Sequence, residues 1–335
     1  MIDPIVVVDG LVKRYKSADR NAVDGISFSV ERGELFALLG PNGAGKTTAI
    51  SVLTTTLAPT SGTVTIAGHD LVTEAAAVRR SIGIVFQRAS LDMNLTAEEN
   101  VRLHAVMYGL FPFRPTFGLM PSAYKEQILQ LAGILGLQNE LFQPIKTYSG
   151  GMRRKLEIVR SLIHRPQVLF LDEPTVGLDP ASRRSLWEYL RQVRAETATT
   201  IFLTTHYLEE AEEADTICII NRGKIVSLGT PAEVKAELVE EYLLLDAEDR
   251  GQLRAELTEK AIPFQELPPF KVPLDGRSAQ ATIKAIDTPL SVLQTRTPSL
   301  EDAYLSIVDA PSPGPQEVPS PSPSPVRGRG ETDNS

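Results

Sequence analysis

The sequence contains a glycine-rich run whose residue types are suited to holding phosphate groups. It follows the apolar residues 35–39 and consists of Gly40-Pro41-Asn42-Gly43-Ala44-Gly45-Lys46-Thr47-Thr48. Glycines let successive backbone N–H groups point at phosphate oxygens, the Lys46 ammonium adds positive charge, and the Thr47 hydroxyl suits a magnesium ion. A strand before the loop and a helix after it would direct a positive helix end at the phosphates. We therefore predict a nucleotide site.

Two adjacent carboxylates follow a second apolar run at residues 168–171. They are Asp172 and Glu173. A buried strand that ends in such a pair delivers one carboxylate to a magnesium ion and the other to an attacking water. Asp172 suits the metal and Glu173 suits the general base. An exposed acidic turn after a core strand would explain the pair equally well by itself, and the phosphate loop upstream favours the chemical role.

A second anion site is predicted where Ser149-Gly150-Gly151 opens a basic-rimmed helix over residues 153–164. A small hydroxyl, bare backbone amides and a positive helix end are again brought together. A bare glycine turn would be weak support for such a site. An enzyme that binds one triphosphate hardly needs two anion sites in a single chain. The presence of both the phosphate loop and the second anion site therefore indicates a protein family that uses both.

With these motifs in this order, residues 7–238 resemble the ATP-binding cassette (ABC) family. Its ATPase domains pair head to tail, and each nucleotide lies between one chain's phosphate loop and the other chain's signature motif. The resemblance implies that Ser149, Gly150 and Gly151 form that signature. Tyr148 and Met152 stand where leucine and glutamine are commoner in the family, outside the part that touches phosphate.

The resemblance also assigns roles to residues that carry no distinctive pattern by themselves. Tyr15 would stack on adenine, and Gln87, at the end of a strand, would touch magnesium or the attacking water. Asp179, in Gly177-Leu178-Asp179, would cross the dimer interface, and His206 would contact the γ-phosphate. A single histidine after a strand is more often structural, so the role of His206 depends on its place after the acidic pair. The implied cofactors are ATP and Mg²⁺, with Thr47, Gln87 and Asp172 around the metal.

The order of apolar patterns predicts an α/β fold. Strands and helices alternate after residue 168, which indicates a parallel sheet, and alternating runs at 5–8, 26–30 and 63–67 predict an antiparallel sheet beside the nucleotide. We predict a P-loop NTPase domain of the ABC type over residues 1–238, with a helical subdomain at about 90–165. Residues 239–309 would form a small α+β, ferredoxin-like βαββαβ domain that a helix from Ser299 closes. The Pro/Ser-rich residues 310–335 cannot bury a core.

The composition limits the classes of partner that the protein can bind. The 335 residues carry a net charge of −8, which argues against a sequence-independent grip on nucleic acid. Cys218 is the single cysteine and lies in an apolar run, so an internal disulfide is impossible and a buried thiol is expected. No basic start precedes a long apolar segment, and no run approaches the ~18 apolar residues of a membrane helix. A cytoplasmic protein is expected, with any membrane role borrowed from a partner.

The resemblance implies a functional setting. Family members with one ATPase domain usually drive a separate membrane permease, which would place this chain on the cytoplasmic face of the cell membrane. Residues 91–93 and 111–121 are candidates for the docking surface, with ordinary packing as the equal alternative. Residues 297–305, which include Pro298-Ser299-Leu300-Glu301-Asp302, resemble the end of drug-export ATPase subunits of the daunorubicin-resistance type.

We therefore predict an ATP hydrolase that powers efflux of a drug-like or other hydrophobic substrate and acts as an ATPase-domain dimer, with a homodimer preferred. A soluble family member that acts on ribosomes or nucleic acid is the alternative. The acidic balance, the single cassette and the absence of heptad repeats disfavour it. A cassette that binds ATP without hydrolysis is disfavoured because Lys46, Asp172, Glu173 and His206 are all present.

Overall fold

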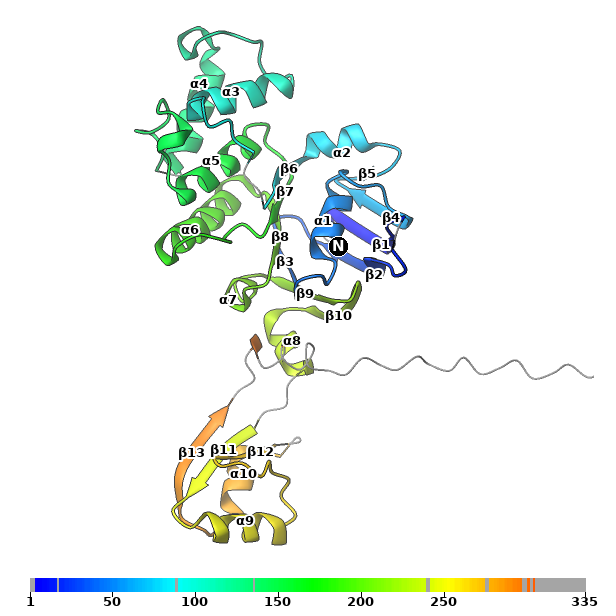
Figure 1. The fold of residues 1–335 in the computed structure, drawn as a ribbon, viewed down its shortest axis with the longest axis vertical. Helices are drawn as coiled ribbons and strands as arrows, with labels where there is room; N and C mark the ends of the chain where they lie inside the picture. The colour runs from blue at the N-terminus through cyan, green and yellow to red at the C-terminus, as the bar shows by residue number, and fades with distance from the viewer. Residues whose placement is uncertain are drawn as a thin grey trace, which may run out of the picture.

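The computed structural model describes residues 4–16, 18–87, 90–134, 136–238, 242–274, 277–296, 300–301 and 304. Two sheets and the helices around them occupy the chain up to residue 238, and a third sheet follows it (Figure 1). The predicted tail at 310–335 and most of the predicted closing helix lie outside the described residues.

A six-stranded sheet forms the centre of the first part. Its order is β10 (Lys224–Gly229), β9 (Thr216–Asn221), β3 (Leu35–Leu39), β8 (Thr200–Thr205), β7 (Val168–Asp172) and β6 (Ile82–Val85). All neighbours are parallel except β10 and β9. The sheet is covered on both faces, which explains why every residue of β3, β8 and β7 is buried. Phe202 packs between Phe36 and Phe170, with ring centroids 5.0 and 5.2 Å away.

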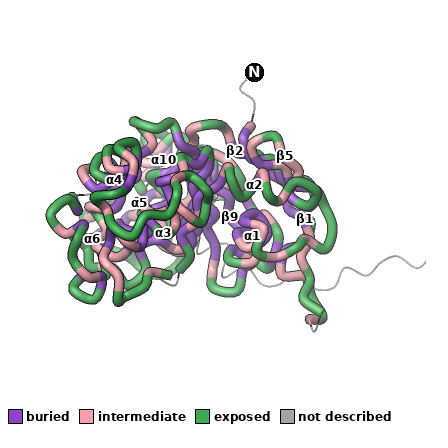
Figure 2. Tube along the Cα trace, turned by 90° about the horizontal axis from the view of Figure 1, so that it is seen from above, coloured by how far each residue is buried: buried purple, intermediate pink, exposed green. Residues whose placement is uncertain are grey.

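Each face of this sheet has its own cover. One face packs against α1 (Lys46–Leu53) and an antiparallel sheet of β2 (Val23–Val30), β1 (Val6–Lys13), β4 (Ser61–Ile66) and β5 (His69–Asp70). The other packs against α5 (Gly150–Leu162), α6 (Pro180–Thr197) and α7 (Leu208–Ala211). The short α2 (Ala75–Ser81) leads into β6. Buried residues therefore run through the middle of the molecule between the two covers (Figures 1 and 2).

The helical subdomain contains α3 (Ala97–Met107), α4 (Ser122–Ile134) and α5, with 3₁₀ turns at Phe117–Leu119 and Ile145–Thr147. Thr96 and Glu99 form a capping box at the start of α3. Within the segment 111–121, Phe111 and Phe117 pack edge-on against buried Tyr124, whereas Phe113 and Leu119 are more than half exposed. The segment thus divides between core packing and a free apolar surface.

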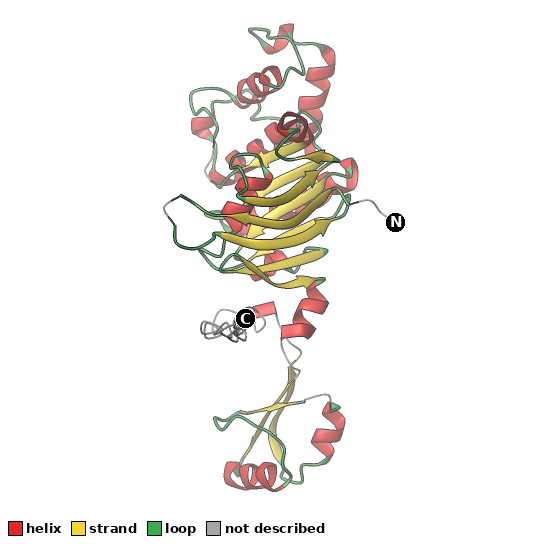
Figure 3. Ribbon diagram, turned by 90° about the vertical axis from the view of Figure 1, so that its right-hand side faces the viewer, coloured by secondary structure: helices red, strands yellow, loops and turns green. Residues whose placement is uncertain are grey.

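The third sheet has its own apolar cluster. After α8 (Pro231–Leu238) the order is β12 (Phe270–Pro273), β11 (Tyr242–Ala247) and β13 (Leu290–Arg296), with α9 (Arg250–Glu259) and α10 (Ala279–Lys284) beside it (Figure 3). The predicted fourth strand is reduced to one bridge between Gln265 and Lys271. Leu300 is buried in the apolar cluster of the first domain, and Tyr304 packs on that cluster. The chain therefore returns to the cassette after the small sheet, and the limits of the domain at 239–309 stay a prediction.

Candidate functional site

The phosphate loop connects β3 to α1 and is curled too tightly for larger residues. A Cβ on Gly40 would lie 2.2 Å from the carbonyl oxygen of Ile220, and one on Gly45 would lie 2.4 Å from that of Ala22. Gly45 also has a φ of 114°, which disfavours other residues. Within the loop, Gly40 and Ala44 are buried. The loop borders a cavity of about 480 Å³. The predicted site residues that line it are Pro41, Asn42, Gly43, Gly45, Lys46, Thr47, Thr48, Gln87, Glu173 and His206.

The carboxylate of Glu173 is the meeting point of this cavity. Its Oε1 lies 3.6 Å from Lys46 Nζ and 3.3 Å from His206 Nδ1, and its Oε2 accepts a hydrogen bond of 3.0 Å from Gln87 Nε2. Glu173 has a positive φ of 45°, a backbone conformation that non-glycine residues adopt at a cost and that is enriched at functional sites. Its backbone N–H is held by the Thr204 hydroxyl, 3.0 Å away. A carboxylate fixed between a cation, an amide and an imidazole is suited to proton abstraction.

Lys46 is almost fully buried. Its ammonium donates to the carbonyl oxygens of Gly40 and Pro41 at 2.7 and 3.3 Å. Burial lowers the pKa of Lys46, and the nearby carboxylates of Glu173 and Asp172 oppose that shift. A cation held by loop carbonyls and one carboxylate can turn toward an anionic group that enters the cavity, because its flexible stem adjusts.

Asp172 lies behind the cavity rather than on its wall. It is 4 % exposed and accepts a 2.6 Å hydrogen bond from the Thr204 hydroxyl. Burial raises the pKa of Asp172, while the Thr204 hydrogen bond opposes the shift. The two carboxylates that adjoin in sequence therefore have different surroundings, as expected when neighbouring acids do different work.

A buried carboxylate that the sequence interpretation missed supports the strand end at His206. Glu210 accepts hydrogen bonds from the hydroxyls of Thr175 and Thr205, the latter at 2.8 Å. Tyr207 follows His206, and their ring centroids lie 4.2 Å apart. Arg183 packs on the Tyr207 ring, with its guanidinium carbon 4.4 Å from the ring centroid. A carboxylate four residues after the histidine gives no sequence signal of its own, because its partner Thr175 lies 35 positions away.

Tyr15 lies beside the cavity and is 42 % exposed. Its hydroxyl is 3.3 Å from Thr48 Oγ1, at the start of α1. The ring is therefore held next to the phosphate loop with an exposed aromatic surface, which is the arrangement that stacking on a flat base requires. Ala22 and Val176 also line the cavity, and neither residue type gave a signal in the sequence.

The predicted signature residues form a separate surface with Asp179. Ser149 is the N-cap of α5 and accepts a hydrogen bond from Met152 N at 3.2 Å. A Cβ on Gly151 would lie 2.6 Å from the hydroxyl of Ser182, and Asp179 caps α6 by accepting from Ser182 N and Oγ. These hydrogen bonds lower the pKa of Asp179. Ser149, Gly150, Gly151 and Asp179 are absent from the lining of the phosphate-loop cavity.

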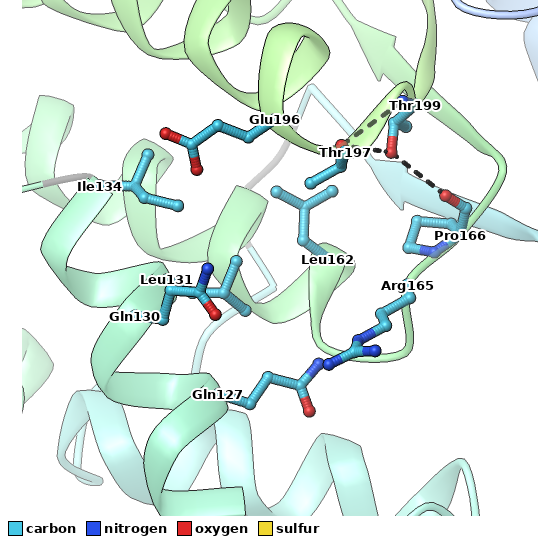
Figure 4. Close-up of a pocket in the computed structure, with 10 residues that line it drawn as sticks. All are labelled: Gln127, Gln130, Leu131, Ile134, Leu162, Arg165, Pro166, Glu196, Thr197 and Thr199. Carbon is cyan, nitrogen blue, oxygen red and sulfur yellow. Dashed lines mark hydrogen bonds between the residues drawn. The ribbon is translucent and has the colours of Figure 1, made fainter. Parts of the chain in front are cut away.

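A second cavity, of about 300 Å³, lies where the ends of α4, α5 and α6 meet (Figure 4). Leu131, Ile134 and Leu162 form its apolar part, and Gln127, Arg165 and Glu196 are among its polar residues. None of the predicted nucleotide residues lines it. Among the helices that the structure describes, none has the length and apolar character needed to cross a membrane.

The residues of the phosphate-loop cavity fit a nucleoside triphosphate. The curled loop leaves room only for glycine at two points, a buried ammonium lies at its end, and a half-exposed aromatic ring lies at its side. Phosphate oxygens are matched by backbone amides and a lysine, and an aromatic ring suits a base.

Comparisons with known proteins agree with this geometry. The family model for ABC transporters matches residues 23–176. A daunorubicin resistance ATP-binding protein of Streptomyces coeruleorubidus is 37% identical, over 92% of this chain and 96% of its own length. A doxorubicin resistance ATP-binding protein of Mycobacterium tuberculosis is 36% identical, over 92% of this chain and 95% of its own.

A solved structure shares the fold of the first domain. CbiO1 from Clostridium perfringens, part of the ABC transporter complex CbiONQ, has a TM-score of 0.62 and 26% identity, over 77% of this chain and 97% of its own. The chain therefore belongs to the ABC transporter family, as an ATP-binding and ATP-hydrolysing subunit related to the drug-resistance proteins.

Proposed function

We propose that the chain powers efflux of a drug-like or other hydrophobic substrate through a separate membrane permease. The observation that carries the proposal is the Glu173 carboxylate, held among Lys46, Gln87 and His206 beside the phosphate loop. The names of two relatives, daunorubicin and doxorubicin resistance ATP-binding proteins, support export of hydrophobic drugs as the purpose.

Residues 40–48 would hold the phosphates of ATP, and Tyr15 would stack on its base. Glu173 would accept the proton of the attacking water, Gln87 would touch that water or the magnesium ion, and His206 would contact the γ-phosphate. Thr47 and Gln87 line the cavity and offer oxygen ligands of the kind that a magnesium ion prefers, and Asp172 would complete the set from behind the cavity wall. The ion, when bound, would neutralise developing phosphate charge.

A dimer of ATPase domains is part of the proposal. Ser149, Gly150 and Gly151 lie outside the chain's own cavity and sit at the positive end of α5, a helix of thirteen residues. Gly150 and Ser149 are exposed, so a second chain can bring its phosphate loop to them. We infer a homodimer in which each nucleotide lies between the loop of one chain and the signature of the other.

The permease would dock on the helical subdomain beside Gln87. Met93, Phe113 and Leu119 are exposed apolar residues of this subdomain, at 37%, 58% and 60%. Exposed apolar side chains in irregular segments mark partner surfaces. CbiO1, which shares the fold, is described as part of a transporter complex. The chain would then lie on the cytoplasmic face of the cell membrane.

We also propose that the small C-terminal domain is a ferredoxin-like unit. β11 lies between β12 and β13 and is antiparallel to both, and the bridge between Gln265 and Lys271 occupies the place of the remaining strand. With α9 and α10, this arrangement supports the chain order βαββαβ.

Purification of the full chain from gently solubilised membranes of its host tests the proposal. We expect a stoichiometric multi-spanning membrane protein to co-purify and to stimulate ATP hydrolysis. Glu173→Gln should abolish the stimulated hydrolysis, and the exposed-site variant Glu188→Gln should retain it. Recovery of the chain only with ribosomes or nucleic acid would contradict the exporter.

A further inference from the structure

Helix α5 covers an edge of the central sheet through polar side chains. β6 is the last strand of that sheet, so one side of its backbone lacks a neighbouring strand. Along this edge His164 Nε2 donates to the carbonyl oxygen of Ile82 and Ser161 Oγ donates to that of Ile84, both at 2.8 Å. A Cβ on Gly83 would lie 2.6 Å from the carbonyl oxygen of Ser161. Helix and strand are thus in direct backbone contact, and the edge is protected.

Arg154 extends this contact to the strand end that carries Asp172 and Glu173. Its guanidinium is in a residue only 7 % exposed and donates to three backbone carbonyls: Phe86 at 2.5 Å, Pro174 at 2.9 Å and Asp172 at 3.0 Å. Asp172 and Pro174 flank Glu173 on both sides. The conformation at Glu173 is therefore tied to a side chain of α5.

Glu157 completes the arrangement on the side of Gln87. Its Oε2 accepts from Arg154 Nη1 at 3.1 Å, and its Oε1 accepts from the backbone N–H of Ser90 at 2.8 Å. Ser90 is also bound through its carbonyl by Arg160. Phe86 and Ser90 lie on either side of Gln87, and Gln87 donates to Glu173 at 3.0 Å. Two buried side chains on one helix therefore hold the backbone around both residues.

We propose that Arg154 and Glu157 are positioning residues that make the placement of Gln87 and Glu173 depend on the orientation of α5. The same helix begins at Ser149, Gly150 and Gly151, so whatever engages these residues acts on the chain's own hydrolysis site through the pair. The inference rests on the proposed roles of Gln87 and Glu173.

The physical basis is the cost of leaving a buried ion pair incomplete. Glu157 is 2 % exposed, and both carboxylate oxygens and three guanidinium nitrogens of the pair have partners. A fully satisfied buried network is rigid, and removal of one member leaves the others desolvated and unpaired. α5 therefore moves together with these loops or loses several charge-assisted hydrogen bonds at once.

Steady-state ATP hydrolysis by the full chain, with Glu157→Gln, tests the inference. The amide retains an acceptor for Ser90 N but places a donor toward Arg154. We expect kcat to fall about 10- to 100-fold, the loss typical of a misplacement near 1 Å. KM for ATP should stay within about 2-fold, since the phosphate loop is untouched. Arg154→Lys should give the same split, because one ammonium cannot replace a planar fork of donors.

The Glu98 and Arg102 pair in α3 provides the matched control. It is an equally buried pair, 3.1 Å apart, whose described partners include Tyr124 and Arg114 but no residue of the nucleotide cavity. Glu98→Gln should lower the melting temperature like Glu157→Gln, yet leave kcat within about 2-fold of the unmodified chain. Equal loss of kcat in both variants would reduce the role of Glu157 to general stability and overturn the inference.

Glu173→Gln separates the two possible failures. If it abolishes hydrolysis while Glu157→Gln and Arg154→Lys leave kcat unchanged, the proposed base stands and the positioning role is wrong. If Glu173→Gln retains hydrolysis, the proposed catalytic assignment itself is wrong. Should Glu157→Gln not fold, Arg154→Lys alone gives the same decision.

Discussion

The Nζ atom of Lys46 lies 3.6 Å from Oε1 of Glu173, and both side chains are nearly buried. The lysine of the phosphate loop is thereby paired with the carboxylate that follows strand β7. Each neutralises the other in the cavity, so a triphosphate has to compete with Glu173 for the lysine. The pair predicts different effects when its members are removed singly.

Lys46→Ala should weaken ATP binding at least 10-fold, because a charge-assisted contact to phosphate is worth more than about 1.4 kcal/mol. Isothermal titration of the nucleotide measures the dissociation constant. Lys224→Ala, at an exposed site paired to Asp24, is the control and should bind ATP normally. Unchanged affinity in Lys46→Ala would remove the lysine from the nucleotide site.

Glu173→Gln should retain ATP binding and lose hydrolysis by about 100-fold or more, since an amide cannot accept the proton of water. ATP should then hold two chains together, and size-exclusion chromatography with and without ATP measures the dimer. Hydrolysis at an undiminished rate would show that another group is the base.

Gly151→Ala should lower the melting temperature and hydrolysis together, because the new Cβ would lie 2.6 Å from the Ser182 hydroxyl and 2.9 Å from its Cβ. Overpacking of this kind costs about 1–3 kcal/mol. Adding Ser182→Gly removes both atoms and should recover most of the lost stability in thermal unfolding. No recovery in the double variant would mean that the crowding at Ser182 is not the cause.

Stability should fall as the pH is lowered below about 6.5, in part through His104. Burial, with Arg160 and His164 nearby, lowers the pKa of His104 from 6.5 to about 3. Between pH 6.5 and about 3, His104 therefore binds a proton in the unfolded chain but not in the folded chain. Stability that is present above pH 6.5 is lost toward pH 3, by at most about 1.4 kcal/mol per pH unit from this group.

His104→Phe preserves a ring next to Tyr108, whose centroid lies 4.5 Å away, and should flatten that pH dependence. Denaturant unfolding at several pH values measures the slope. An undiminished slope in His104→Phe would show that His104 does not contribute to it. The pKa of His164 is also lowered by burial, so some slope is expected to remain in His104→Phe.

The sequence by itself determined the family, the phosphate loop and the order of the motifs. These features are local: a nine-residue run, an apolar strand and a helix start specify one another through backbone geometry and side-chain periodicity. The family was confirmed.

The tertiary structure alone decided which groups meet. Gln87 and Glu173 are 86 positions apart, and Glu173 and His206 are 33 apart, so only the strand order brings their side chains to one cavity. It also placed Asp172 behind that cavity, separated Ser149 from it, and reduced the fourth strand of the small sheet to one bridge. Arg154 and Glu157 gave no signal because a buried ion pair is defined by its partners, and those partners include backbone groups 18 to 68 positions away whose proximity no local pattern encodes.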